Sequence, residues 1–243
     1  MKTYRHNGFT IVELLVVIAI IAILSALIIP ALSRSKQAGQ RAVCVNNLRQ
    51  LGFAAQMYWD DHEGRMFRFR GGTTNGGDIY WFGWLERGAE GKRKFDLSQG
   101  VLFPYLGGKG VEVCPALQYR MSEFKLKALG ASYGYGYNLH LSPALNASLN
   151  INQVRHPQDI ALFADAGQVN TFQAPASPDR PMLEEFYYIS TNEPTVHFRH
   201  SGKASTLFCD GHVSAENMEH GSLDDRLPTQ KIGRLPLPML TPK

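Results

Sequence analysis

The chain has 243 residues, of which 44% are hydrophobic, 19% charged and 11% aromatic. This composition is typical of a folded protein and excludes a chain that is disordered throughout. The formal net charge of +4 is small and no long basic run is present, which argues against a nucleic-acid-binding protein. The length suffices for one sizeable globular domain and a membrane anchor.

The first element along the chain is an apolar segment, residues 9–32, which follows a short basic leader. A helix of this length spans roughly 36 Å, enough to cross a bilayer core of about 30 Å. A secretory signal has a shorter apolar core with a small-residue cleavage site behind it, and this segment has neither. Its only charged residue is Glu13, and a carboxylate in the hydrocarbon region of a membrane is costly and usually functional.

The residues around this acid, GFTIVE at positions 8–13, resemble the processing site of type IV prepilins and type II secretion pseudopilins. The resemblance is carried by the basic leader, by Gly8 before the cleaved bond, by Phe9 after it, and by Glu13 as the fifth processed residue. Pro30 stands where many of these proteins have a helix-kinking proline. The resemblance implies cleavage after Gly8 by a prepilin peptidase, N-methylation of Phe9, and a single-pass anchor in the bacterial inner membrane with the head outside the cytoplasm.

Glu13 has a physical role in this interpretation. The positive N-terminal end of a helix favours an anion, and cleavage creates an amino group on Phe9 about one helical turn away. We predict that Glu13 of one subunit pairs with this amine on a neighbouring subunit and sets the axial register of a filament. The alternative is that the Glu13 side chain reaches toward the lipid headgroups.

An amphipathic segment, residues 33–61, continues the apolar run as the same helix. We expect Pro30 to bend this helix without ending it. Residues 9–32 then form the membrane or filament-core part, and residues 33–61 pack on a globular head. The apolar residues that recur at steps of three and four are Ala38, Ala42, Val45, Leu48, Leu51, Ala55 and Tyr58.

The globular head is expected to be α+β and to comprise residues 62–218. Between Gly71 and Gly110 eleven residues are glycine, which predicts loops, turns and short segments. Residues 219–243, rich in proline and charge, are predicted to form an extended tail. The strands expected in the head are residues 111–113, 133–138, 160–165, 185–190, 204–209 and 212–216.

Aromatic residues are interleaved with the glycines of this segment. We interpret them as anchors that pack the loops onto the core, and a carbohydrate-binding platform is the alternative. The residues concerned are Trp81, Phe82, Trp84, Phe103 and Tyr105.

A second motif lies near the C-terminus, where His200 is followed after nine residues by Asp210-Gly211. The local sequence predicts a β-hairpin, and Asp-Gly is a common dipeptide of type I′ turns. The motif resembles the H-X9-DG signature of a prepilin-type family that is associated with processing. Members of that family often carry two further marks, present here as CVNNLRQLG at residues 44–52 and as Cys114-Pro115.

The three cysteines permit one disulfide and leave one thiol. The pairs 44–114, 44–209 and 114–209 are all open, as is a fully reduced chain. We favour Cys44–Cys114, because this pair would tie the glycine-rich loop to the helix.

We predict neither a metal nor a cofactor. His197, His200, Asp210 and His212 are suitable ligand types, but nothing in their spacing fixes a coordination geometry. Asp224-Asp225 is a weak candidate for a structural calcium site, because two adjacent acids make a poor cage.

The sequence therefore predicts an α+β, pilin-like fold with one long N-terminal helix packed on a small antiparallel sheet with long glycine-rich loops. Because no catalytic motif is present, we do not expect an enzyme. The expected function is that of a structural subunit of a type IV pilus or a type II secretion-like filament. Its partners would be a prepilin peptidase and methylase, copies of itself or related pilins, and an inner-membrane assembly platform. The alternative is a membrane-tethered binding protein of the cell envelope that does not polymerise.

Overall fold

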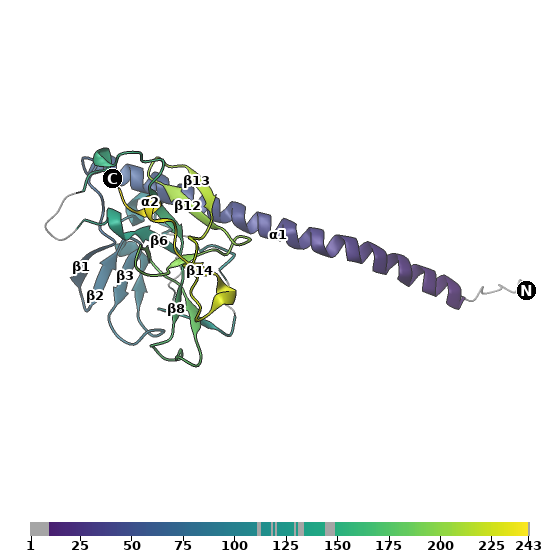
Figure 1. Ribbon diagram of the computed structural model, residues 1–243. Coiled ribbons are helices and arrows are strands. Elements are labelled where there is room, and N and C mark those ends of the chain that lie inside the picture. The colour runs from purple at the N-terminus through teal and green to yellow at the C-terminus, as the bar shows by residue number, and fades with distance from the viewer. Residues whose placement is uncertain are drawn as a thin grey trace, which may run out of the picture. The chain divides into compact units, whose positions relative to one another are not determined.

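A computed structural model describes residues 10–110, 113–117, 119, 121–128, 130, 134–143 and 149–242. The chain divides into two compact units, residues 1–39 and residues 40–243. The described part of the first unit is helical from Ile11 onward, and the second unit contains the sheets (Figure 1). The α+β class and the long N-terminal helix agree with the prediction.

Helix α1 runs from Ile11 to Asp61 and continues through Pro30, as expected. The chain leaves the helix at Glu63 and Gly64, which both have positive φ angles of 57° and 77°. The buried face begins only at Cys44, because Ala38 and Ala42 of the predicted stripe are exposed. The buried residues are spaced at three and four positions, and they are Cys44, Asn47, Leu48, Leu51, Ala54, Ala55 and Trp59.

The central sheet has five strands in the order β10-β6-β7-β12-β13. The pair β10–β6 is parallel and the other pairs are antiparallel, so the sheet is mixed, whereas an antiparallel sheet was predicted. Its strands are β6 (Tyr135–Asn138), β7 (Ala161–Asp165), β10 (Tyr188–Ile189), β12 (Ala204–Phe208) and β13 (Val213–Glu216).

Three smaller sheets complete the described part of the head, where a single small sheet was predicted. One is the antiparallel sheet β1 (Arg70–Thr74), β2 (Gly77–Tyr80), β3 (Gly83–Glu86) and β4 (Phe95–Asp96). The others are β5 (Phe124–Lys125) with β9 (Met182–Glu184) and β8 (Gln168–Asn170), and β11 (Val196–His197) with β14 (Ile232–Gly233). The short helices are η1 (Leu97–Gln99), η2 (Phe103–Leu106), η3 (Leu139–Leu141), η4 (Ile151–Gln153), η5 (Pro228–Gln230) and α2 (Leu237–Leu240).

The first half of the glycine-rich segment forms the β1–β4 sheet, although we expected loops there. Asn75 and Gly76 connect β1 to β2 with φ angles of 49° and 76°. Positive φ at both positions defines a two-residue type I′ turn, which matches the twist of an antiparallel pair. Asn-Gly is therefore the sequence signal that identifies this hairpin.

Two of the predicted strands differ from the observed ones. The segment 111–113 forms no strand at Val113, and residues 111 and 112 lie outside the described residues. The segment 185–190 is reduced to β10, because β9 ends at Glu184 and the chain between them is not in a ladder. The strands expected at 160–165, 204–209 and 212–216 are present with slightly shorter bounds.

Helix α1 packs on the central sheet at a close approach. A Cβ atom on Gly52 would lie 3.1 Å from Leu207 Cδ1, so glycine allows the helix backbone to approach β12. Leu48 and Leu51 belong to the same core cluster as Trp81 and Phe163. Trp81 is fully buried, and its indole Nε1 donates a hydrogen bond to the Tyr187 carbonyl oxygen at 2.9 Å. The aromatic residues of the glycine-rich segment thus serve the core.

Residues 219–242 do not form an extended tail. β14 pairs with β11, and Leu235 and Leu240 are buried. The Asn138 side chain donates a hydrogen bond to the Leu240 carbonyl oxygen at 2.9 Å. Burial of an aliphatic side chain stabilises a fold by about 1.5–3 kcal/mol, which explains why this segment is part of the head despite its prolines.

Candidate functional site

The start of α1 carries a capping box formed by Thr10 and Glu13. The Glu13 carboxylate oxygen Oε2 accepts hydrogen bonds from the Thr10 backbone N–H at 2.9 Å and from its hydroxyl at 2.7 Å. In return, the Thr10 hydroxyl oxygen accepts the Glu13 backbone N–H at 3.2 Å. This reciprocal arrangement satisfies donors that a helix start otherwise leaves unpaired. Gly8 and Phe9, the predicted processing residues, lie outside the described residues.

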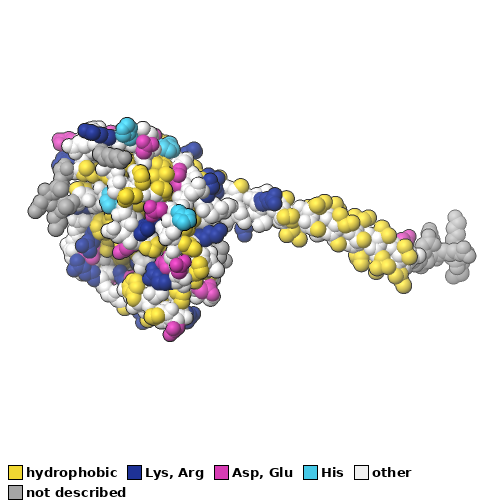
Figure 2. All heavy atoms as spheres, in the orientation of Figure 1, with side chains coloured by type: hydrophobic (Ala, Val, Ile, Leu, Met, Phe, Trp, Pro, Cys, Tyr) yellow, Lys and Arg dark blue, Asp and Glu magenta, His cyan; other side chains and the backbone are white. Residues whose placement is uncertain are grey.

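Apolar side chains cover the helix that follows this cap. In the described part of the chain α1 is the one helix long and apolar enough to cross a membrane, with a mean hydropathy of 3.1 over its most apolar window. The large apolar side chains between Ile11 and Leu32 are 44–78% exposed, and Figure 2 shows them over much of the visible surface of the first unit. A helix that is apolar all round requires lipid or other helices around it.

The two ends of the H-X9-DG motif lie at opposite ends of β12. His200 and Lys203 exchange backbone hydrogen bonds of 3.0 and 3.1 Å across a turn in which Ser201 and Gly202 have φ angles of 56° and 82°. These angles define a type I′ turn. The nine intervening residues therefore belong to this turn, to strand β12 and to one further position. The spacing of the motif thus corresponds to the length of β12.

The turn at Asp210-Gly211 is not the predicted type I′ turn. Only Gly211 has a positive φ, of 91°, and its N–H donates to the Phe208 carbonyl oxygen at 3.0 Å. This is the three-residue hairpin loop that ends on a left-handed glycine. The Asp210 carboxylate oxygen Oδ1 accepts the backbone N–H of His212 at 3.1 Å and lies 2.6 Å from its Nδ1. Asp210 therefore stabilises an exposed hairpin tip.

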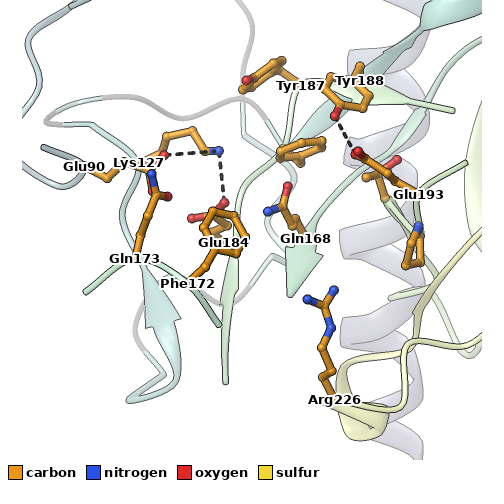
Figure 3. Close-up of a pocket in the computed structure, with 13 residues that line it drawn as sticks. Glu90, Lys127, Gln168, Phe172, Gln173, Glu184, Tyr187, Tyr188, Glu193 and Arg226 are labelled. Atoms are coloured by element: carbon orange, nitrogen blue, oxygen red, sulfur yellow. Dashed lines mark hydrogen bonds and ion pairs between the residues drawn. The ribbon is translucent and has the colours of Figure 1, made fainter. Parts of the chain in front are cut away.

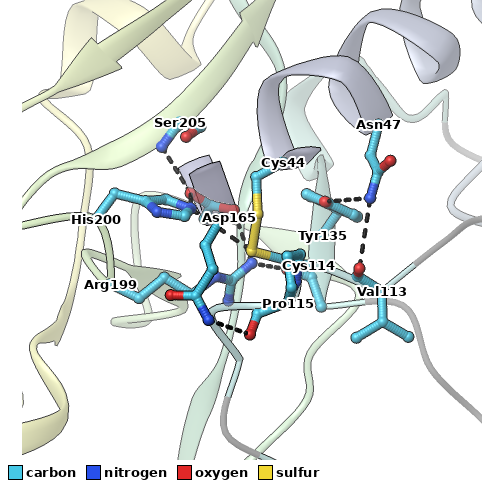
Figure 4. The surroundings of a disulfide bond; sticks show 12 residues. Cys44, Asn47, Val113, Cys114, Pro115, Tyr135, Asp165, Arg199, His200 and Ser205 are labelled. Carbon is cyan, nitrogen blue, oxygen red and sulfur yellow. Dashed lines mark hydrogen bonds and ion pairs between the residues drawn. A yellow bond between two sulfur atoms is a disulfide. The ribbon is translucent and has the colours of Figure 1, made fainter. Parts of the chain in front are cut away.

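His200 points instead into a buried cluster around a disulfide that joins Cys44 to Cys114 (Figure 4). This is the pair that the sequence favoured. The His200 Nε2 atom lies 3.5 Å from Cys114 Sγ and 3.3 Å from Asp165 Oδ2. Burial lowers the pKa of His200, although the nearby Asp165 carboxylate opposes this effect. The imidazole is consequently neutral at physiological pH.

The Asp165 carboxylate at the end of β7 is held from two sides. Its Oδ1 accepts a hydrogen bond from Arg199 Nη2 at 2.7 Å, and its Oδ2 accepts one from the Ser205 backbone N–H at 2.7 Å. Because both charged side chains are almost fully buried, this pair has little solvent screening. No motif in the sequence marked Asp165, since its role depends on which segments meet in space.

Helix α1 also holds the segment that contains Cys114 through its side chains at steps of four and three. Gln40 Nε2 donates to the Pro115 carbonyl oxygen at 3.1 Å. Asn47 Nδ2 donates to the Tyr135 hydroxyl at 3.1 Å and to the Val113 carbonyl oxygen at 3.4 Å. The disulfide at Cys44 lies between these two contacts, so three side chains of one helix face fix this segment.

The residues of the two metal sets considered from the sequence make other contacts in the structure. His197 lies in β11 next to Arg199, with its Nδ1 3.2 Å from Arg199 Nη1, whereas Asp210 and His212 form the hairpin tip. Both carboxylate oxygens of Asp224 accept hydrogen bonds from the Arg226 side chain, at 2.9 and 2.6 Å. Asp224 is therefore engaged in a bidentate ion pair with Arg226.

The head also contains a pocket of about 450 Å³, shown in Figure 3. Its inner wall is a buried ion cluster in which Lys125 contacts both Glu90 and Glu184, and Lys127 lies 3.0 Å from Glu184 and 3.8 Å from Glu90. Phe172 at its edge is 66% exposed. A ligand in this pocket would meet a mutually neutralised ion cluster and an aromatic ring.

Comparison with known proteins adds two findings. Residues 4–29 match the family model of the prokaryotic N-terminal methylation motif. Over 55 residues the chain is 38% identical to the type II secretion system core protein G of Pectobacterium carotovorum subsp. carotovorum, a match that covers 23% of this chain and 35% of that protein. The chain thus spans about a third of the length of the curated relative that it matches. No solved structure matches the chain.

Proposed function

We propose that this chain is a structural subunit of a filament of the type IV pilus or type II secretion class. The observation that carries the proposal is that the methylation motif at residues 4–29 leads into a single helix, α1, whose first half is apolar and exposed. Such a surface is stable in a bilayer, and after extraction it is stable against the same surface of other subunits. The similarity to core protein G supports the same class.

Processing and location follow from the same segment. A prepilin peptidase would cleave the chain between Gly8 and Phe9, and a methylase would modify the Phe9 amine. The chain would cross the inner membrane once, with the head outside the cytoplasm, and would then enter a filament of like or related subunits on an assembly platform. The disulfide supports this location of the head, because disulfides persist in oxidising compartments. The role is structural and requires no catalysis.

Glu13 has two roles in this proposal. Within its own subunit it completes the helix cap, and Oε2 takes part in both of those bonds. We assign the second oxygen, Oε1, to the processed amine of Phe9 on a neighbouring subunit. A hydrogen bond between charged groups contributes about 1.5–3 kcal/mol. This amount corresponds to a change of about 10- to 150-fold in the association constant of each subunit.

Two substitutions separate the roles of this residue. Glu13→Gln keeps a side chain that can accept the cap hydrogen bond but removes the charge. Thr10→Ala removes the cap but keeps the charge. We expect both variants to be inserted and cleaved, Thr10→Ala to assemble, and Glu13→Gln to fall at least about tenfold in sheared filament material. Normal assembly of Glu13→Gln would refute the register role.

The function itself is tested by mass spectrometry of membranes and of sheared extracellular material. The expected result is a chain that begins with N-methyl-Phe9 and that is present in a high-molecular-mass filament fraction. A processed chain that stays monomeric in the membrane would instead favour the tethered binding protein, for which the pocket beside Lys127 and Phe172 is the candidate binding site. Capture of a small ligand that Phe172→Ala abolishes would identify that second function.

In this proposal the residues of the H-X9-DG motif have structural roles in the head. His200 reaches the disulfide that ties the head to α1, and Asp210 closes the hairpin β12–β13. We propose that the chain belongs to the prepilin-type family with this signature, and that this membership explains why both residues are present. Their separation across β12 indicates two structural contacts and no common active site.

A further inference from the structure

We propose that the reduced form of the head binds Zn²⁺ through Cys44, Cys114, Asp165 and His200. The four ligand atoms lie within 4.8 Å of one another, and all four residues are buried. They come from α1, the loop after η2, the end of β7 and the turn before β12. This site is independent of polymerisation, so its test does not depend on the proposed function.

Two of the distances between the ligand atoms already suit a tetrahedral zinc ion. With Zn–S of about 2.3 Å and Zn–N of about 2.05 Å, a ligand sulfur and nitrogen lie about 3.5 Å apart, and a nitrogen and oxygen about 3.3 Å apart. The observed separations are 3.5 Å between Cys114 Sγ and His200 Nε2, and 3.3 Å between His200 Nε2 and Asp165 Oδ2. The Sγ–Sγ edge must open, because two thiolate ligands lie about 3.8 Å apart, and the remaining edges are within 4.8 Å. The disulfide and the metal site therefore exclude each other.

The groups that surround the four ligand residues also suit a zinc site. Ligand carboxylates are normally oriented by further hydrogen bonds. Here the Ser205 N–H and the Arg199 guanidinium hold Asp165 at 2.7 Å each. Two thiolates, one carboxylate and Zn²⁺ leave a net charge of −1, which the positive charge of Arg199 balances. A buried site with a balanced charge avoids most of the desolvation cost of an isolated ion.

The step between the two forms is a two-electron reduction. A dithiol donates two electrons that break the Sγ–Sγ bond, and it leaves as its own disulfide. Its two protons pass to the Cys44 and Cys114 sulfurs. Zn²⁺ then binds both sulfurs as thiolates, and these two protons go to solvent. The chain is synthesised in the reduced state, since disulfides form only after it reaches an oxidising compartment.

The zinc form would preserve the same link as the disulfide. In both forms the segment that carries Cys114 is tied to α1 at Cys44. His200 then has a chemical reason to lie at this place, because it supplies the nitrogen ligand.

The test uses the full chain in detergent micelles, once oxidised and once reduced with a dithiol that is then removed under nitrogen. We expect about one Zn²⁺ per reduced chain and none in the oxidised chain, by elemental analysis after gel filtration. Co²⁺ in place of Zn²⁺ should give the visible absorption of a tetrahedral ion and a sulfur-to-cobalt charge-transfer band. Circular dichroism in the near ultraviolet should show that the zinc-loaded reduced head is folded.

Cys209→Ser is the matched control, because it removes the third, buried thiol, which lies outside the site. This variant should bind zinc like the wild type. His200→Ala should lose more than about 100-fold in zinc affinity, since even groups that only hydrogen-bond to a metal ligand contribute about 10–100-fold. A reduced wild-type chain that binds no zinc, that binds it while unfolded, or that binds it equally well after His200→Ala would overturn the proposal.

Discussion

Removal of the disulfide by the double substitution Cys44→Ala with Cys114→Ala should destabilise the head strongly. The two cysteines are 70 residues apart in the chain, and closing a loop of this length lowers the entropy of the unfolded chain. The chain-entropy relation gives about 4 kcal/mol for such a loop at room temperature. We therefore expect the free energy of unfolding of the head to fall by about 4 kcal/mol.

Tryptophan fluorescence in a urea titration of the full chain in detergent measures this loss. The three tryptophans of the chain, Trp59, Trp81 and Trp84, are all buried in the head, so their signal reports its unfolding. With an m value of about 2–3 kcal/mol/M, the midpoint should fall by about 1.3–2 M urea. The slope of the transition also reports whether the unfolded state of the variant has expanded.

Cys209→Ala provides the control for the loss of a buried sulfur. It leaves the 70-residue loop closed, so its midpoint should change by no more than about a quarter of that of the double variant. If the double variant and this control lost the same stability, the entropic account of the disulfide would be refuted.

Two further predictions concern Gly136 in the central sheet and the buried carboxyl group of Glu185. Gly136→Ala should destabilise the head by about 1–3 kcal/mol, because a Cβ atom there would lie 2.7 Å from the Tyr188 carbonyl carbon. Gly71→Ala is the control, because a Cβ atom at Gly71 would have no neighbour within 4 Å. Equal urea midpoints of the two variants would contradict the expectation. Burial raises the pKa of Glu185 to about 8 from an ordinary 4.5, so the folded state holds a proton that the unfolded state has lost. Stability is then fully present below pH 4.5 and is lost as the pH rises through 8, at up to about 1.4 kcal/mol per pH unit. Urea midpoints between pH 7 and pH 8 should fall for the wild type and stay level for Glu185→Gln, since the buried His197 and His200, whose pKa values are lowered, act only below about pH 6.5.

The sequence predicts the helix well because the signal for α1 is local. The apolar run, the absence of a stop at Pro30 and the spacing of Leu48, Leu51 and Ala55 all report the same element. The capping box at Thr10 and Glu13 is also local and is readable as T-x-x-E, although from the sequence we interpret Glu13 only as a charge that is favoured at the helix start and that pairs with the Phe9 amine. Because these residues belong to a processing motif, their structural role as a helix cap was missed.

The strands are harder, because a strand depends on partners that are distant in the chain. β10 has only two residues and joins the sheet through parallel pairing with β6, which no local pattern indicates. The Asn75-Gly76 turn was a usable signal, but the glycines around it suggested loops. The C-terminal segment has few apolar residues. It packs on the head because Leu235 and Leu240 are buried in a second hydrophobic cluster, separate from the one that contains Leu48 and Leu51.

The disulfide cluster shows why a motif can identify residues without locating a site. Cys44 and Cys114 could be paired from the sequence only by a preference, since three pairings were open. His200 belonged to a motif whose other member, Asp210, lies at the far end of β12. Asp165, which completes the cluster, was marked only as the last residue of an expected strand.

The position of the disulfide on α1 has a mechanical consequence if the helix is the element that polymerises. Cys44 is the first buried residue of α1, so a separation of the helix from the head that starts at this end passes only the Gln40–Pro115 hydrogen bond before it meets the covalent bond. The contacts beyond it, from Asn47 to Trp59, are non-covalent, and such contacts open one after another under a load that starts at one end. A bond at the first position makes them share the load. We therefore expect reduction to weaken extraction from the membrane more than it weakens the head itself, and comparison of filament yield with head stability in Cys44→Ala would measure the difference.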